Sequence, residues 1–226
     1  MENRKRGNYH VMRDMSPGTE VLYVNPHSKN EEIRPFLAQR DFRIALSLAI
    51  NRAEINFILF SGTAVPSRGI ASPYDPYYLP EFDEKYLDYD PRRAEELLDG
   101  VGLKRGPSGM RCLPDGKRFR QIIYIFATEI GTPVEMWQLV ADYFREVGLD
   151  FVVQVDAVAL SPMRMWNGNT DFWAYSTAGI HWVLDPVWFV PCRSASYFAP
   201  LYGRYIASNG KDKMGVKPPE EYQRIY

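Results

Sequence analysis

The chain has 226 residues, of which 46% are hydrophobic, so it is long enough and apolar enough to bury a substantial core. Its 27 basic and 28 acidic residues nearly cancel, which leaves a net charge of −1. This balance argues against nucleic acid or an anionic membrane as a partner, because both require a strong positive field. No apolar run approaches the ~20 residues of a membrane helix, and the N-terminus lacks the apolar core of a secretory signal.

The first predicted elements are a strand and a helix. Residues 21–24 (VLYV) are typical of a short strand. Asp41 is expected to open a helix, because its carboxylate can accept hydrogen bonds from the free N–H groups of the first turn. The expected buried face of this helix is an apolar stripe at helical spacing, formed by Phe42, Ala45, Leu46, Ala49 and Ile50.

A second helix is predicted directly after the first. Asn51 and Glu54 resemble a capping box, with Asn in place of the usual Ser or Thr. The helix should end at residues 61–62 (Ser-Gly). Its expected buried residues are Ile55, Ile58 and Leu59. The stretch 64–80 is rich in Pro, Gly and Tyr and predicts an ordered loop, because its tyrosine rings need a surface on which to pack.

The next helix has clear start and stop signals. Asp90 can cap it and Pro91 suits its first position, while Gly100 and Gly102 should end it. Its expected buried residues are Ala94, Leu97 and Leu98. Residues 113–116 (LPDG) predict a turn.

The following segment predicts a βαβ unit. A strand over 121–127 precedes a helix that starts at 132–135 (TPVE), and a second strand covers 151–155. Strand, helix and strand at this spacing predict two parallel neighbours in one sheet. A short helix over 160–167 and a strand over 172–176 complete the pattern.

Motifs of common catalytic and cofactor sites are absent from the sequence. It contains no phosphate-binding P-loop, no glycine fingerprint for a dinucleotide and no nucleophile elbow. The histidines, His10, His27 and His181, have no partner at metal-ligand spacing. Cys112 and Cys192 are expected to be unpaired thiols. The sequence therefore predicts a protein without metal or cofactor that is not an enzyme.

Aromatic residues gather in the last third of the chain. Four of the five tryptophans lie within a short stretch, at Trp166, Trp173, Trp182 and Trp188. Such a concentration of rings is either a plug in the core or the wall of a binding site, where flat apolar faces meet sugar rings or peptide side chains. Strand alternation should send Trp173 and Tyr175 to one face of the sheet and Phe172, Ala174 and Ser176 to the other.

Several segments resemble one known family. Residues 40–52 (RDFRIALSLAINR) are similar to its pattern D-x-R-V-R-x-A-L-x-x-A-I-D-R, and residues 89–102 are similar to its pattern Y-D-P-x-K-A-x-x-L-L-x-x-A-G. Further matches follow the family's order, at residues 22–25, 114–117, 168–172 and 210–220. Over about residues 21–220 the chain thus resembles the family 5 extracellular solute-binding proteins, the oligopeptide- and dipeptide-binding receptors of ABC importers.

The resemblance implies an α/β fold, namely a class II periplasmic-binding-protein-like lobe with a mixed sheet flanked by helices. In this family two lobes close over a solute and present it to a membrane permease. Because members are longer, we expect a fragment, with an inter-lobe strand and lead-in segment in residues 1–40 and a truncated second, C-terminal lobe in residues 41–226. The parent is expected to be a periplasmic or extracellular monomer, free or lipid-anchored, and the isolated lobe is expected to bind solute weakly.

The expected ligand-binding residues act as binders and not as catalysts; they are Tyr175, Ser176, His181, Trp182, Asp185 and Trp188. Peptide receptors of this family often place an Asp shortly before an acidic residue and Pro, where it pairs with the peptide amine, but here Trp182 stands near that position. A buried ammonium without a carboxylate is costly, so an oligosaccharide bound by aromatic stacking is the alternative to a peptide. A carboxylate-based hydrolase and a protein-interaction module are the further alternatives.

Overall fold

The computed structural model describes residues 19–68, 78–126, 134–157, 161–176 and 186–220. One mixed sheet organises this part of the chain, with the strand order β1-β6-β4-β5. Its strands are β1 (Glu20–Val24), β4 (Arg120–Phe126), β5 (Asp150–Asp156) and β6 (Phe172–Ser176). β4 lies parallel to both β5 and β6, which confirms the predicted βαβ unit, and β1 closes the edge antiparallel to β6.

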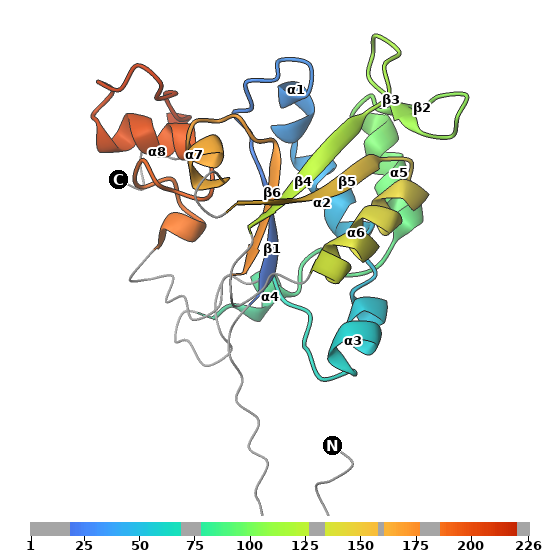
Figure 1. Ribbon diagram of the computed structural model, residues 1–226. Coiled ribbons are helices and arrows are strands. Elements are labelled where there is room, and N and C mark those ends of the chain that lie inside the picture. The colour runs from blue at the N-terminus through green and yellow to red at the C-terminus, as the bar shows by residue number, and fades with distance from the viewer. Residues whose placement is uncertain (1–18, 69–77, 127–133, 158–160, 177–185, 221–226) are drawn as a thin grey trace, which may run out of the picture.

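Helices cover both faces of this sheet (Figure 1). Those described are α1 (Arg34–Leu37), α2 (Arg40–Leu48), α3 (Arg52–Phe60), α4 (Pro80–Asp83), α5 (Pro91–Gly100), α6 (Val134–Glu146), α7 (Ser161–Trp166) and α8 (Pro200–Ala207). In Figure 1, α2, α5 and α6 lie on one side of the sheet, and α7 and α8 lie on the other. A small ribbon of β2 (Lys104–Arg105) and β3 (Arg111–Cys112) projects from one end. The mixed sheet flanked by helices confirms the predicted fold class.

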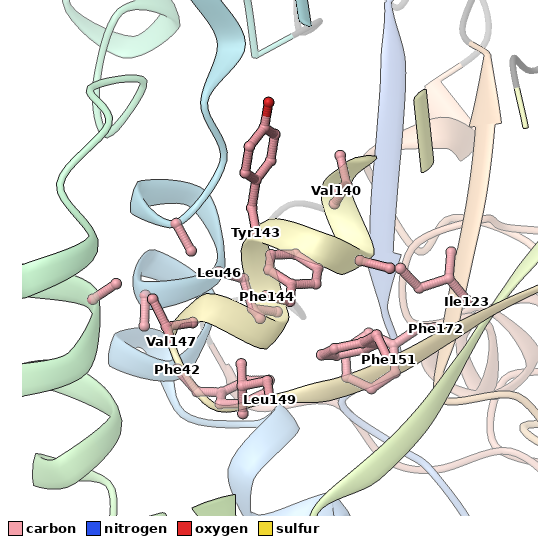
Figure 2. Packing of buried hydrophobic residues seen from close by; sticks show 14 of the residues in the cluster. Phe42, Leu46, Ile123, Val140, Tyr143, Phe144, Val147, Leu149, Phe151 and Phe172 are labelled. Carbon is pink, nitrogen blue, oxygen red and sulfur yellow. The ribbon is translucent and has the colours of Figure 1, made fainter. Parts of the chain in front are cut away.

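The main core fills the layer between the sheet and the helices α2, α5 and α6. Five phenylalanine rings form its centre in a chain of edge and tilted contacts, and they are Phe42, Phe119, Phe144, Phe151 and Phe172. Figure 2 shows α6 laying Phe144 and Val140 toward the sheet residues Phe151 and Ile123. α6 has buried residues at helical spacing, and this face packs against the sheet. The helix connects the parallel strands β4 and β5.

Of the four predicted helix starts, two are confirmed, one is wrong, and the one at Thr132 lies outside the described residues. The Asn51 side chain accepts a hydrogen bond from the Glu54 N–H at 3.1 Å, and the Asp90 side chain accepts one from the Arg93 N–H at 2.9 Å. The prediction for Asp41 is wrong. α2 begins one residue earlier, at Arg40, so Asp41 lies inside the first turn and makes no capping bond. Its carboxylate can still interact favourably with the positive end of the helix dipole.

The burial predicted for α3 is also wrong in part. Ile55 is buried and Leu59 is partly buried, but Ile58 is 52% exposed. The helix ends as predicted, with Ser61 in the left-handed conformation. α3 stands at the lower right of Figure 1 and meets the body of the lobe along one side only, so the opposite side of its apolar surface has no cover among the described residues.

Two smaller predictions concern the cysteines and the domain boundary. Cys112 and Cys192 are both free thiols, as predicted. The edge strand β1 precedes the predicted boundary at residues 40/41 and yet pairs with β6 in the sheet of the lobe. The boundary itself stays a prediction.

Replacing Gly203 by alanine is expected to destabilise the lobe by about 2–3 kcal/mol, because a Cβ there would overlap the backbone carbonyl of Arg193. Gly100, at the end of α5, is a matched control with no atom within 4 Å of the added Cβ. Gly100→Ala should leave stability unchanged or raise it by about 0.5–1 kcal/mol. Urea unfolding of both variants measures the difference. Equal stabilities would mean that α8 does not pack closely against the turn at Arg193.

Candidate solute-binding site

The carboxyl ends of three strands and the amino end of the fourth lie at the same edge of the sheet, the edge to which the strands run. β4, β5 and β6 run parallel, so their carboxyl ends meet at this edge, and the antiparallel strand β1 begins there. The register places Ser176, the last residue of β6, opposite Glu20, the first residue of β1. In Figure 1 this is the lower end of β1 and β6. In open α/β sheets, ligands bind outside the carboxyl ends of the strands, so this edge is the expected place for a site.

A pocket of about 720 Å³ lies along β1, from Glu20 at this edge to Val24 at the other end of the strand. None of the described residues of β4, β5 or β6 lines it. Its volume lies within the ~300–1,000 Å³ typical of small-molecule sites. Residues from β1, α2, α3 and α6 line it, together with the segments 64–68 and 188–198. Its larger apolar side chains are Phe60, Val65, Met136, Trp137, Val140, Trp188, Phe189 and Phe198. The pocket therefore brings together parts of the chain that are far apart in the sequence.

Stacked aromatic rings continue from the pocket wall into a second, smaller hydrophobic cluster, which contains Tyr23 and Trp173. Trp188 stacks on Tyr197, with ring centroids 3.8 Å apart and planes at 10°. Tyr175 stacks on the same indole at 5.2 Å and 26°. Tyr197 continues to Tyr23 at 6.1 Å, and Tyr23 stacks on Trp173 at 5.8 Å and 10°. This column fixes the orientation of Trp188, which lines the pocket together with Tyr23.

The structure separates the two roles that the aromatic residues could play. Trp173 is 0% exposed and packs with Tyr23 and Met165, so it belongs to the core. Trp188 is half-buried and lines the pocket, so it can contact a ligand. The predicted alternation along β6 is confirmed, since Phe172 lies in the main core and Trp173 in this second cluster.

Three of the six predicted site residues lie in the described part of the chain. Tyr175 and Ser176 are half-buried at the carboxyl end of β6, next to the start of β1, and Trp188 lines the pocket. Tyr175 does not line the pocket and stacks on Trp188. The other three predicted residues, His181, Trp182 and Asp185, lie outside the described residues.

Polar groups of the pocket come from residues to which sequence reasoning assigned no site role. The guanidinium of Arg52 donates to the Ser47 carbonyl at 2.8 Å, the Ser47 hydroxyl at 2.9 Å and the Leu87 carbonyl at 3.2 Å. Burial, together with the nearby positive charge of Arg68, lowers the pKa of Arg52 to about 10. Arg52 is therefore still charged at neutral pH. The only sequence signal for a site role of Arg52 is that this basic residue directly follows the predicted cap at Asn51.

A clamp on Asn56 holds the segment that carries Arg68. The Asn56 amide donates to the Ala64 carbonyl at 2.9 Å, and its oxygen accepts from the Ala64 N–H at 2.9 Å. The Asn56 carbonyl also accepts from the Gly62 N–H at 2.9 Å. These bonds tie residues 62–64 to α3, so the start of the following pocket wall, residues 64–68, is fixed to the helix.

Two kinds of feature are missing from the described residues, a metal-binding cluster and a membrane-spanning helix. Among the residues that the structure describes, no three His, Cys, Asp or Glu side chains come together in a group that could hold a metal ion. None of the described helices combines the length and the apolar character that crossing a membrane requires.

The mixed sheet flanked by helices is the fold of a periplasmic-binding-protein-like lobe. Residues 2–195 match the sequence model of the bacterial extracellular solute-binding proteins, family 5, middle region. The chain belongs to this family, whose members are binding proteins.

Solved structures of similar proteins agree with this assignment. An oligopeptide-binding protein OppA is 30% identical with a TM-score of 0.81, over 100% of this chain and 38% of that protein. The oligopeptide-binding protein AppA from Bacillus subtilis, in complex with a nonapeptide, is 16% identical with a TM-score of 0.64, over 99% and 44%. A periplasmic oligopeptide-binding protein from Thermotoga maritima, with mannohexaose bound, is 22% identical with a TM-score of 0.61, over 92% and 41%. The chain thus spans about two fifths of the length of these relatives.

Proposed function

We propose that this chain is part of the receptor component of an ABC-type importer, which binds an oligopeptide or peptide-like solute between two lobes and delivers it to a membrane permease. The observation that carries the proposal is the pocket along β1, in a chain of family 5. A similar protein of 30% identity is named an oligopeptide-binding protein. The receptor acts as a monomer outside the cytoplasmic membrane, in the periplasm or the extracellular space, free or lipid-anchored.

The solute lies against the lower edge of the sheet in Figure 1. Trp188 forms its apolar contact, and Tyr175 and Ser176 border it at the end of β6. His181, Trp182 and Asp185 complete the set of proposed binding residues, because they follow β6 in the chain. The remainder of the receptor supplies the opposite wall, which is why the lobe by itself binds weakly.

An oligosaccharide is the second candidate solute. The stack of Tyr175, Trp188 and Tyr197 favours it, because sugar rings pack on flat aromatic faces. One solved relative also holds mannohexaose. A hydrolase with paired carboxylates has less support, since Glu20 is the only acidic side chain among the described residues that line the pocket.

Mass spectrometry of small molecules released from the complete gene product tests the proposal. The protein is produced from its full reading frame and purified without dialysis, so that a tightly bound solute stays in place. Co-purified short peptides support the peptide receptor, and co-purified sugars move the assignment to the oligosaccharide receptor. Chemical turnover of the released compounds by the protein would contradict both.

Replacing Trp188 by alanine in the complete gene product is expected to weaken solute binding at least tenfold. The change removes a ring that lines the pocket and leaves Tyr175 and Tyr197 without their stacking partner. Calorimetric titration with the identified solute measures the dissociation constant. Tyr89→Ala is the control, because Tyr89 is exposed and does not line the pocket. An unchanged affinity in Trp188→Ala would remove Trp188 from the site.

A further inference from the structure

The outer surface of α3 is apolar and exposed. Phe57 is 79% exposed and Ile58 is 52% exposed, although both are large apolar side chains. The sequence from residue 55 to residue 67 contains no charged side chain, so the surface has no charge of its own to keep it in water. Exposed apolar patches of this kind are typical of surfaces that bind a partner.

The contacts of α3 hold this surface in a fixed position. The Asn51 side chain caps the first turn, and the Asn56 side chain binds the N–H and the carbonyl of Ala64. On the opposite face of the helix, Ile55 is buried in the main core. The helix cannot turn its outer surface inward without breaking these contacts. Burial of Phe57 therefore requires a surface from outside the described residues.

The outer surface of α3 continues into the pocket along β1. Phe60 follows Phe57 by three positions and is its neighbour on the helix surface; it lines the pocket and is 37% exposed. Val65 also lines the pocket and is 73% exposed. A wall that covers the pocket at Phe60 therefore also meets Phe57.

The remainder of the same polypeptide is the occupant that fits this surface best. The chain spans about two fifths of the length of its solved relatives, so most of such a protein lies outside it. The proposed function already requires the remainder to supply the wall opposite the pocket. Once that wall covers Phe60 and Val65, too little apolar surface stays free on α3 for a stable interface with a second copy.

We propose that the outer surface of α3, formed by Phe57, Ile58 and Phe60, binds an apolar patch on the remainder of the polypeptide, and that this contact forms when the solute is enclosed. The inference rests on the proposed function and adds residues that set the affinity without touching the solute. Apparent affinity depends on the fraction of the receptor in its binding-competent state. A contact that stabilises the enclosed state therefore strengthens binding.

Alkylation of the thiol introduced by Phe57→Cys tests the contact in the complete gene product. All other cysteines are replaced by serine, and the probe solute is a pool of tri- to hexapeptides with neutral side chains. We expect the peptides to slow the reaction with iodoacetamide at least tenfold, because the enclosed state covers position 57. Arg92→Cys is the control, since the Arg92 side chain is 87% exposed on α5 and does not line the pocket. Its reaction rate should not depend on peptide.

Phe57→Asp is expected to weaken binding of the same peptides at least tenfold in calorimetry, because enclosure would bury the new carboxylate against apolar side chains. Phe57→Leu keeps an apolar side chain and should stay within threefold of the wild type. Met163→Asp is the matched control, because Met163 is 60% exposed on α7, on the other side of the sheet, and should leave the affinity unchanged. Phe57 is so exposed in the lobe that neither change at this position removes core packing.

Three results overturn the inference, and they can be told apart. Equal alkylation rates at position 57 with and without peptide, or an unchanged affinity in Phe57→Asp, would remove the contact while peptide binding as such would stand. Protection that rises with protein concentration and does not depend on peptide would assign the surface to a second copy of the chain. Absence of peptide binding to the wild type would remove the proposed peptide function, and with it the inference.

Discussion

Replacing Arg111 by methionine is expected to lower the free energy of unfolding by about 3 kcal/mol. Arg111 is 1% exposed, and its guanidinium joins α5, the loop after it and the end of α6. Its Nε donates to the Val147 carbonyl at 2.8 Å, and its Nη1 donates to Asp99 at 2.7 Å and to the Leu103 carbonyl. The Glu95 carbonyl accepts a fourth bond at 3.2 Å.

Methionine keeps most of the volume of the side chain and removes every donor. The carbonyls of Leu103 and Val147 then stay buried without their hydrogen bonds, which is the main cost. Both lie just beyond the carboxyl ends of α5 and α6, where a positive charge is also favoured by the helix dipoles. The chain therefore loses hydrogen bonds and a favourable charge at the same place.

Urea unfolding of the wild type and of Arg111→Met measures the effect. Arg92→Met is the matched control, since it makes the same change on an 87% exposed arginine that pairs only with Glu96 on the same helix. Its expected cost is below about 0.5 kcal/mol. If the two variants unfolded at the same urea concentration, the buried network would contribute nothing measurable to stability.

Replacing Trp173 by alanine is expected to cost about 4 kcal/mol, the second large effect. The indole is fully buried between Tyr23 and Met165, so its removal leaves a cavity that the rigid strands β1 and β6 cannot close. The smaller change Trp173→Phe keeps a ring in the stack and should cost about half as much. Thermal or urea unfolding of the three proteins gives the series.

The comparison with Trp188 sharpens this prediction. Trp173 and Trp188 belong to one column of rings, but of these two only Trp188 lines the pocket. Trp173→Ala should therefore act on stability, whereas Trp188→Ala should act mainly on binding. A Trp173→Ala protein as stable as the wild type would show that this ring does not belong to the core. Trp173 would then be a candidate for contact with the solute.

Local features of the structure could be predicted from the sequence. The caps at Asn51 and Asp90 depend on residues only three positions apart, so the pattern alone reveals them. The strands β4 and β5 and the helix between them follow from hydrophobic periodicity at short range. Six short motifs in order also identified the family. The start of α2 was predicted wrongly, because Asp41 fits a cap by residue type but lies inside the first turn of the helix.

Tertiary structure alone decided which residues meet in the pocket. The packing of α2, α3 and the segment after β6 beside β1 brings Glu20, Arg52, Arg68 and Trp188 to one pocket, although 168 positions of the sequence separate the first from the last. The burial of Trp173 and the partial exposure of Trp188 were also undetermined, because both residues are equally apolar in the sequence. Contacts between distant segments depend on how strands pair and helices cross, and periodicity within one segment carries no record of its neighbours. The sequence thus determined the elements and the family, and packing determined the site.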